Sequence, residues 1–290
     1  MTAPELRLGL PKGRMQDGVL DLLREAGVQV KLSTRGYRPI VSLPGVGAKV
    51  LKPQNIIEML HVGSRDLGFA GADWVHELGY DLDGKLVELM DTGLDPVRIV
   101  VAAPETVLEN GRLPQRPLVV ASEMPETARK WIARTGLNAT VVRTYGATEV
   151  FPPEDADAIV DITATGDTLQ ANKLVIIDEI LRSSTRLYAH AHAMETAEKR
   201  QRIEEIVLLL ESVLEARRRV MVDLNVEKAA LDAVLEVLPC LRLPTVSPLR
   251  EDGFAIRAAV PRAELPRLIP ELKARGATDL VVTSPAQIVR

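Results

Sequence analysis

The order of strands and helices constrains this chain more than any other feature of its sequence. In the first two thirds, short apolar segments alternate with segments of helical period. Residues 6–10 predict a strand, residues 16–26 a helix that ends at Gly27, and residues 66–70 a strand that runs into Gly71. Such alternation is typical of an α/β fold whose sheet is largely parallel.

The same patterns extend along the rest of the chain. We expect further strands at 98–103, 118–121, 139–143 and 158–161, with helices at 55–62, 127–134 and 195–218. After the last of these helices the order becomes β-α-β-β-α-β, with strands at 220–224, 243–249, 254–260 and 280–283 and helices at 227–238 and 262–274. That order predicts a ferredoxin-like module.

Composition excludes several classes of protein. The 290 residues carry a net charge of −4 and include only 2 Trp, 4 Tyr and 3 Phe, so the basic stripe and stacking surfaces of a nucleic-acid binder are missing. A single cysteine, Cys240, excludes a disulfide framework and a cysteine-based zinc site. Apolar runs are far too short for a membrane span, and no secretory signal precedes the first strand. We expect a cytoplasmic protein that acts on small molecules.

Charge is distributed unevenly along the sequence. Residues 217–290 hold 12 basic and 9 acidic side chains, and the remainder holds 24 and 31, a net charge of −7. An anionic ligand of the first 216 residues must therefore be bound by local donors and not by the overall field.

The segment 163–168 is the most informative for chemistry. It follows an expected strand, contains three threonines and one glycine, and precedes an expected helix near Leu169. Main-chain N–H groups and hydroxyls in such a turn suit a phosphate dianion. The alternative is a plain capped helix start, because Thr and Asp are favoured caps.

Acidic and basic residues lie near the same kind of strand end. Asp157 and Asp161 are four residues apart on one expected strand, so they share a face and could hold ribose hydroxyls or a metal ion. Glu149 adds a third acid in a glycine-containing turn. Lys12 and Arg14 follow the first strand, at the edge where open α/β sheets bind ligands. For each group the alternative is a solvated surface position.

Other familiar sites have no support. The sequence has no Gly-x-Gly-x-x-Gly, no Walker loop and no Gly-x-Ser-x-Gly, which argues against dinucleotide oxidation, P-loop hydrolysis and esterase chemistry. His190 and His192 are two residues apart and lack the helical spacing of metal ligands, so we expect them to be structural or exposed.

Together these segments resemble a known family. The stretch 157–172, DAIVDITATGDTLQAN, resembles the phosphoribosyl-pyrophosphate signature of the ATP phosphoribosyltransferases, which catalyse the first step of histidine biosynthesis. LPKGRM at 10–15, DLGFAGAD at 66–73, GATE at 146–149 and LPTVSPL at 243–249 resemble other segments of the long-form enzyme, in the same order. The resemblance covers essentially the whole chain.

The resemblance implies that N1 of ATP displaces pyrophosphate from C1 of phosphoribosyl pyrophosphate, with Mg2+ on the pyrophosphate. A ring nitrogen needs no activated side chain, so catalysis rests on alignment and on stabilising positive charge on the sugar. Lys12, Arg14, Glu149, Asp157 and Asp161 are the implied catalytic residues. The implied substrate-binding residues are Gly71, Asp73, Thr163, Ala164, Thr165, Gly166, Asp167, Thr168 and Leu169. Because Mg2+ is usually held by substrate oxygens, we expect no dedicated protein site for it.

The resemblance also implies the architecture. We expect a two-lobed catalytic body like that of type 2 periplasmic binding proteins, with lobe one at 1–95 and 183–216 and lobe two at 96–182. A regulatory ACT-like module is expected at 217–290, with histidine as a feedback inhibitor. Its candidate contacts are Asn225, Leu241, Thr245 and Ser284. The family implies a homo-oligomer, a dimer or a hexamer. The alternative is a non-catalytic ligand sensor of the same fold, although the intact loop with its acid pair favours turnover.

Overall fold

The structure is a computed structural model that describes residues 6–33, 36–80, 83–250 and 252–290. It divides into two compact units. One comprises the chain up to Asp21 together with Gln29–Ile203, and the other comprises Leu22–Val28 and Glu204–Arg290. The first unit carries the segments that resemble a substrate site.

An eight-stranded sheet runs through the described part of the first unit, in the order β4-β1-β5-β10-β6-β9-β7-β8. Its strands are β1 (Leu6–Pro11), β4 (Val46–Leu51), β5 (Leu67–Gly71), β6 (Leu86–Pro104), β7 (Leu118–Ser122), β8 (Ala139–Arg143), β9 (Ala158–Thr163) and β10 (Leu174–His190). A separate hairpin is formed by β2 (Val30–Ser33) and β3 (Gly36–Val41). The helices of this unit are α2 (Pro53–His61), α3 (Ala72–Leu78), α4 (Pro125–Thr135), α5 (Asp167–Ala171) and α6 (Ala191–Glu195). Two more, α1 (Met15–Glu25) and α7 (Ala197–Arg218), each contribute residues to both units.

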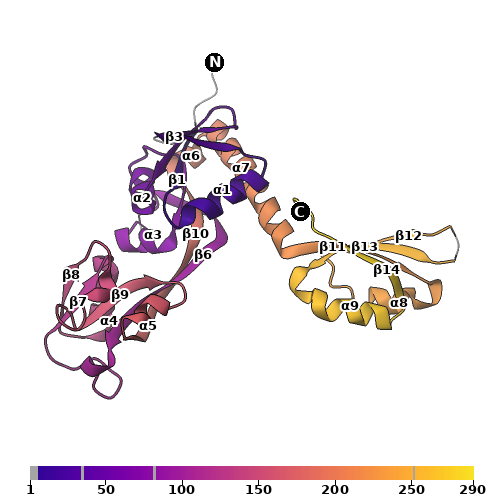
Figure 1. Cartoon of the computed structure of the whole chain (residues 1–290). Helices are drawn as coiled ribbons and strands as arrows, with labels where there is room; N and C mark the ends of the chain where they lie inside the picture. Colours follow the sequence, from indigo (N-terminus) through magenta and orange to yellow (C-terminus); the bar gives the residue numbers. More distant parts are fainter. Residues whose placement is uncertain (1–5, 34–35, 81–82, 251) are drawn as a thin grey trace. The chain divides into compact units, whose positions relative to one another are not determined.

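Two long antiparallel strands connect the two halves of this sheet. β6 and β10 pair from Leu86↔His190 at one end to Pro104↔Leu174 at the other (Figure 1). β10 also pairs with β5, and β6 also pairs with β9, so the strand pair belongs to both halves. We call β1, β4 and β5 with α1–α3 the first lobe, and β7, β8 and β9 with α4 and α5 the second lobe. The register of the β6–β10 pairing shifts between Ser183 and Thr185. The lobe boundaries expected near residues 95 and 182 stay a prediction.

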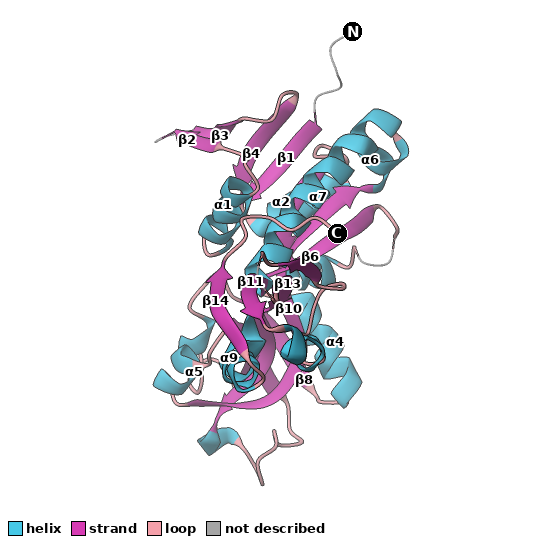
Figure 2. Cartoon of the chain, turned by 90° about the vertical axis from the view of Figure 1, so that its right-hand side faces the viewer, coloured by secondary structure: helices cyan, strands magenta, loops and turns pink. Residues whose placement is uncertain are grey.

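Within each lobe the outer strands are parallel. β1 pairs in parallel with β4, beside which it lies in Figure 2, and with β5. β7 pairs in parallel with β8 and β9. Parallel strands end at a common edge, so the loops that leave their carboxyl ends are neighbours. Each lobe therefore has one edge on which polar loop residues converge.

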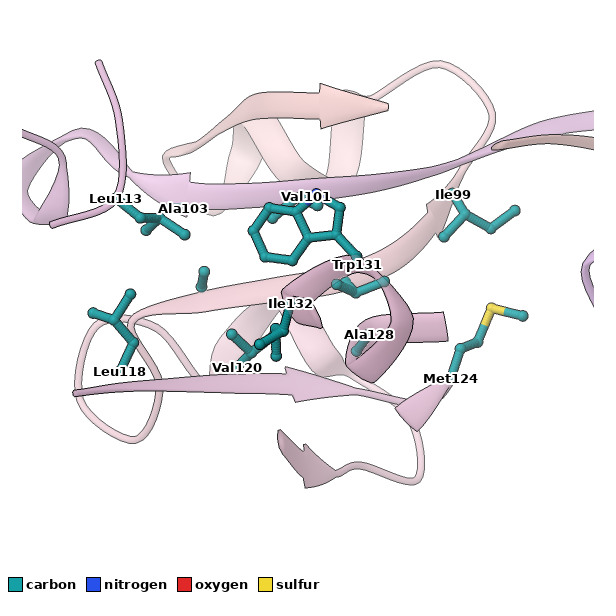
Figure 3. Close-up of a cluster of buried hydrophobic side chains, with 12 residues drawn as sticks. Ile99, Val101, Ala103, Leu113, Leu118, Val120, Met124, Ala128, Trp131 and Ile132 are labelled. Atoms are coloured by element: carbon teal, nitrogen blue, oxygen red, sulfur yellow. The ribbon is translucent and has the colours of Figure 1, made fainter. Parts of the chain in front are cut away.

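Both faces of the second lobe's sheet are buried. On one face, Ile99, Val101 and Ala103 pack with Trp131 and Ile132 of α4, as Figure 3 shows. The intervening residues of β6 point to the other face, toward a cluster formed with α5. The period-two alternation thus fills two apolar clusters and fixes which face each polar residue of β6 and β9 occupies.

The second unit contains a four-stranded antiparallel sheet in the order β12-β13-β11-β14. Its elements are β11 (Arg219–Val226), α8 (Leu231–Leu235), β12 (Thr245–Pro248), β13 (Phe254–Pro261), α9 (Leu265–Ala274) and β14 (Ala277–Thr283). Alternate residues of β11, which are Val220, Val222, Leu224 and Val226, form one core with α8 and α9. The expected βαββαβ order is confirmed.

Many elements lie where the sequence predicts them, although the strands β2, β3 and β4 were not predicted. The prediction of only short strands was wrong for β6 and β10, because each long strand mixes apolar and polar residues as it passes through two lobes. His192 lies on a helix, α6, and not on the strand that carries His190. β10 ends at His190, whose Nδ1 accepts a hydrogen bond from the N–H of His192 and so caps α6.

Candidate functional site

Lysines gather at the carboxyl edge of the first lobe. Lys12 follows β1, and its Nζ lies 5.6 Å from the centre of the Tyr37 ring. Lys49 lies in β4 and Lys52 follows that strand. These side chains, with Asn55, line an open hollow of about 350 Å³. Three ammonium groups around one hollow suit a polyanion, although the lobe belongs to the more acidic part of the chain.

A buried carboxylate lies at the end of the next strand. Asp73, in the first turn of α3, is fully buried, and its Oδ1 accepts a hydrogen bond from Ser183 Oγ at 2.8 Å. Its Oδ2 has no partner among the described groups. Burial raises the pKa of Asp73, and the Ser183 hydroxyl and the nearby Arg14 offset this only in part. The edge of the sheet at which β1 and β5 end thus carries Lys12, Arg14 and Asp73.

Gly71 allows the backbone to pass close to the Asp73 carboxylate. A Cβ atom built at Gly71 would lie 1.9 Å from Asp73 Oδ1 and 3.0 Å from the Met15 methyl group. No side chain fits at that position unless Asp73 moves. Gly71 is therefore needed for the close turn between β5 and α3, which is a packing reason for its place in the site.

The segment 163–168 forms the loop between β9 and α5. Thr163 is buried, whereas Ala164, Thr165, Asp167 and Thr168 are exposed. Gly166 takes a φ of +96° and lies at the N-cap of α5, and the N–H of Asp167 donates weakly to Thr165 Oγ1 at 3.4 Å. Asp167 is the first residue of this helix, so it does not occupy the N-cap position. Leu169 packs inward and anchors the loop to the sheet.

A partly buried carboxylate, that of Asp161, lies just before this loop. Asp161, on β9, interacts electrostatically with Glu149 and with Glu123, which follows β7. Burial raises the pKa of Asp161, the N–H of Ile162 opposes this, and the two glutamates add to it, so that the pKa reaches about 6. Like charges collected in a partly dry place indicate a site built to meet positive charge. We call Asp161, Glu123 and Glu149 the acid cluster.

Short hydrogen bonds hold the segments that carry the two glutamates. The Ser122 hydroxyl donates to the Val160 carbonyl at 2.6 Å and accepts from the N–H of Met124 at 2.9 Å. The Thr144 and Thr148 hydroxyls lie 2.8 Å apart. The Ser122 bonds tie the turn after β7 to β9, and the Thr144–Thr148 bond holds the turn after β8 together.

The structure does not bring Asp157 into this group. Asp157 precedes β9, whereas the loop 163–168 follows it, so the two lie at opposite ends of the strand. Its carboxylate accepts hydrogen bonds from Arg116 at 2.7 Å and from the N–H of Val119 at 2.8 Å. Burial raises the pKa of Asp157, but these two partners outweigh it and lower the pKa. The expectation that both aspartates lie at one end of the strand was wrong, because Asp157 precedes β9 and Asp161 lies within it.

Sequence reasoning missed several residues of these edges. Glu123 could have been found from its place just after a predicted strand. Lys49 and Lys52 could not, because β4 was not predicted. Arg98 lies directly opposite Thr163 in the antiparallel pairing of β6 with β9, a relation that only the register shows.

The second unit contains a hollow of about 320 Å³ lined by polar residues of all four strands. Asn225 and Thr245 line it together with Asp223, Arg257 and Asp279. Asn225 Nδ2 donates to Asp279 Oδ2 at 3.0 Å, and Arg257 Nε donates to Asp223 Oδ1 at 2.5 Å.

The two other candidates of this unit lie elsewhere. The N–H of Leu241 donates to the Ala259 carbonyl, and the Ser284 hydroxyl accepts from Arg262. Neither residue is among those that line the hollow.

Two other kinds of site are absent from the described residues. No cluster of three His, Cys, Asp or Glu side chains is arranged to hold a metal ion. No helix in the described ranges is both long and apolar enough to cross a membrane.

Comparison with known proteins identifies the family. The family profile described as ATP phosphoribosyltransferase matches residues 52–212, and that of its C-terminal domain matches residues 216–285. The ATP phosphoribosyltransferases of Pelodictyon phaeoclathratiforme and Chlorobium luteolum are 37% and 38% identical over 281 residues, which cover 95% of this chain and 94% of each relative. The chain belongs to the ATP phosphoribosyltransferase family.

A solved structure agrees with this assignment. The ATP phosphoribosyl transferase (HisG:HisZ) complex from Thermotoga maritima matches with a TM-score of 0.63 and 26% identity, over 72% of this chain and 98% of that one. The family resemblance and the two-lobed fold with its C-terminal module are thus confirmed. As a member of the ATP phosphoribosyltransferases, the protein is a phosphoribosyltransferase of histidine biosynthesis and not a non-catalytic sensor.

Proposed function

We propose that this enzyme holds phosphoribosyl pyrophosphate on the second lobe and ATP on the first, and transfers the phosphoribosyl group to N1 of ATP. The observation that carries the proposal is the placement of the loop 163–168 directly beside the acid cluster, at one edge of the second lobe. The 5-phosphate of the substrate needs the donors of the loop, and C1 of its ribose, which pyrophosphate leaves, needs the negative charge of the acid cluster.

The loop supplies neutral donors for the 5-phosphate. The exposed hydroxyls of Thr165 and Thr168 and the main-chain N–H groups around Gly166 can donate to phosphate oxygens. Hydrogen bonds to a charged group are worth about 1.5–3 kcal/mol each. The buried neighbours Thr163 and Leu169, with Ala164 between loop and strand, keep the backbone in place.

The acid cluster meets the sugar. As pyrophosphate leaves C1, positive charge develops on the ribose, and ionised Asp161 and Glu149 stabilise it and accept hydrogen bonds from the ribose hydroxyls. A positive sugar and bound donors also favour the ionised form of Asp161, which the protein alone disfavours. We withdraw Asp157 from this role and assign it to holding β7 against β9.

The cationic edge of the first lobe meets the phosphates of ATP or the departing pyrophosphate. Lys12 and Arg14 are retained in this role, and Lys49 and Lys52 join them because they line the same hollow as Lys12. Asp73 lies beside Arg14 and is suited to orient it or a polar group of the nucleotide. The nucleophile is the ring nitrogen itself, so the residues align two substrates and activate neither.

We propose that Mg2+ takes part and is held mainly by substrate oxygens. The carboxylates of the acid cluster are the hard oxygen donors that this ion accepts, while no dedicated cage exists in the described residues. When bound, the ion neutralises charge on the pyrophosphate. Glu149 and Glu123 are the residues best placed to contact it or its waters.

The hollow of the second unit is our candidate for feedback inhibition by histidine. Asp223 and Asp279 suit the ammonium and imidazole groups, and Arg257 suits the carboxylate. Asn225→Ala and Thr245→Ala should each raise the histidine concentration for half inhibition. Ser284→Ala is the matched control, because Ser284 does not line the hollow. Equal sensitivity in all three variants would refute this site.

Three further proposals concern the whole enzyme. We expect it to act in the cytoplasm, where both substrates are made, and to form a homodimer or homohexamer, which light scattering can determine. We place the boundaries of the lobes near residues 95 and 182, within β6 and β10.

The decisive experiment combines the protein with ATP, phosphoribosyl pyrophosphate and Mg2+. We expect mass spectrometry to detect the N1-phosphoribosyl adenylate and pyrophosphate. Lys12→Ala should slow this turnover without altering the thermal melting temperature. Lys31 is an exposed lysine that does not line the hollow, so Lys31→Ala should leave turnover unchanged. A Lys12→Ala enzyme with normal turnover would reduce residues 11–14 to a plain turn.

A further inference from the structure

The N-terminus of α4 lacks a cap from its own sequence. Met124 occupies the N-cap and provides no side-chain hydrogen bond, and Pro125 begins the helix. Helices usually begin with Ser, Thr, Asp or Asn at this place, because their first N–H groups need an acceptor. In α4 the acceptor must come from another part of the chain.

Glu77, near the end of α3 in the first lobe, supplies it. Its Oε1 accepts a hydrogen bond from the N–H of Glu126 at 3.0 Å, and its Oε2 accepts from the N–H and the hydroxyl of Thr127, both at 2.8 Å. Glu77 is 6% exposed and Thr127 is fully buried. A second contact joins the same elements, from Lys130 Nζ to the His76 carbonyl at 3.1 Å. A buried carboxylate with three donors is a strong link between the lobes.

This link lies between the two edges of the site. Glu77 is one turn after Asp73 on the same face of the short helix α3, and Asp73 lies at the cationic edge. On the other side, Thr127 is four residues after Glu123, a member of the acid cluster, and Ser122 ties that segment to β9. The Glu77 side chain thus connects the cationic edge of the first lobe with the segment of the second lobe that carries Glu123.

We infer that Glu77 is a positioning residue, whose carboxylate caps α4 across the lobes and so keeps the acid cluster aligned with the cationic edge during transfer. This inference rests on the proposed function of the two edges. It concerns alignment and not affinity, because each edge can hold its own substrate without the other.

The test compares Glu77→Ala and Glu77→Gln with a matched control, Glu126→Gln, which changes an exposed acid at the same helix end. Misalignment of reacting groups by about 1 Å can cost about 100-fold in rate. We expect kcat of Glu77→Ala to fall about 10- to 100-fold, with KM for either substrate changed less than about threefold. Glu77→Gln keeps one acceptor oxygen and should be intermediate. Glu126→Gln should match the wild type.

Hydrogen exchange tests the contact without activity. In the wild type the main-chain N–H groups of Glu126 and Thr127 should be protected, and in Glu77→Ala this protection should be lost while the exchange of β7 and β9 is unchanged. Should Glu77→Ala fail to fold, Glu77→Gln carries both measurements.

The possible failures can be told apart. An unchanged kcat, or a raised KM with normal kcat, would overturn the positioning role, and unprotected N–H groups in the wild type would overturn the contact. A wild type that makes no product would overturn the proposed function instead.

Discussion

Asp161 allows a test in which stability and activity should change in opposite directions. Its folded pKa is raised to about 6 from 3.8, because the carboxylate is partly buried and faces Glu149 and Glu123. The folded state therefore holds this proton more tightly than the unfolded chain does. The free energy of unfolding should fall as the pH rises from about 4 to about 6, and the full penalty should be present above that range.

The size of the penalty follows from the shift. At 1.36 kcal/mol for each pKa unit, a shift of this size corresponds to about 3 kcal/mol, and residual contact with water reduces it to about 1–3 kcal/mol. Asp161→Asn keeps the shape and the acceptor oxygen that binds the N–H of Ile162. At pH 7 to 8 this variant should therefore be about 1–3 kcal/mol more stable than the wild type, and at pH 4 the two should be nearly equal.

The assay is urea unfolding between pH 4 and pH 8, at fixed protein concentration. Trp131 lies in the apolar cluster of the second lobe, so its fluorescence reports the part of the protein that carries Asp161. Asp157→Asn, at the residue just before β9, is the matched control. Its carboxylate has a lowered pKa through Arg116 and the N–H of Val119, so its loss should destabilise the protein at neutral pH.

Turnover should change the other way. Asp161→Asn should lose at least about 100-fold in kcat, since a carboxylate that stabilises developing charge is removed. A variant less stable than the wild type at pH 7, or a stability difference equal at pH 4 and pH 7, would refute the electrostatic reasoning. Stabilisation with normal turnover would remove Asp161 from the site.

Three further changes test other parts of the structure. Burial raises the pKa of Asp66, but hydrogen bonds from Arg7 and Lys199 outweigh this effect and lower the pKa to about 2. About 2 kcal/mol of the free energy of unfolding should therefore be lost as the pH falls from about 4 to about 2. Asp66→Asn should abolish that pH dependence in urea titrations. Gly71→Ala should lower the free energy of unfolding by about 1–3 kcal/mol, and with it the melting temperature, because the new methyl group overlaps Asp73. An unchanged melting curve would contradict this packing. Thr165→Ala combined with Thr168→Ala should weaken binding of phosphoribosyl pyrophosphate by about 1–3 kcal/mol in calorimetry, and unchanged affinity would refute the loop assignment.

Much of this enzyme could be predicted from the sequence because the signals are local. The period of apolar residues identified β1, β7, β8 and β9 and the helices α1, α2 and α4 with errors of a few residues. The βαββαβ order of the last 70 or so residues needed only the succession of elements. The loop 163–168 was recognisable because its glycine, its threonines and its position after a strand are all properties of adjacent residues.

What the sequence could not provide depends on pairing between distant segments. β6 and β10 carry a mixed pattern, since one end of each lies in the first lobe and the other end in the second. The register of these strands decides that Arg98 lies opposite Thr163. The parallel arrangement of β1 and β4 decides that Lys12 shares a hollow with Lys49 and Lys52.

Asp157, which precedes β9, and Asp161, which lies on it, show the same division. By itself, the sequence determined that these two aspartates border one buried apolar segment, four residues apart. Only the tertiary structure decided their roles. Asp157 received Arg116 and the N–H of Val119 as partners, whereas Asp161 received two glutamates and a raised pKa. The physical reason is that charge and hydration depend on neighbours in space, and those neighbours are supplied by folding.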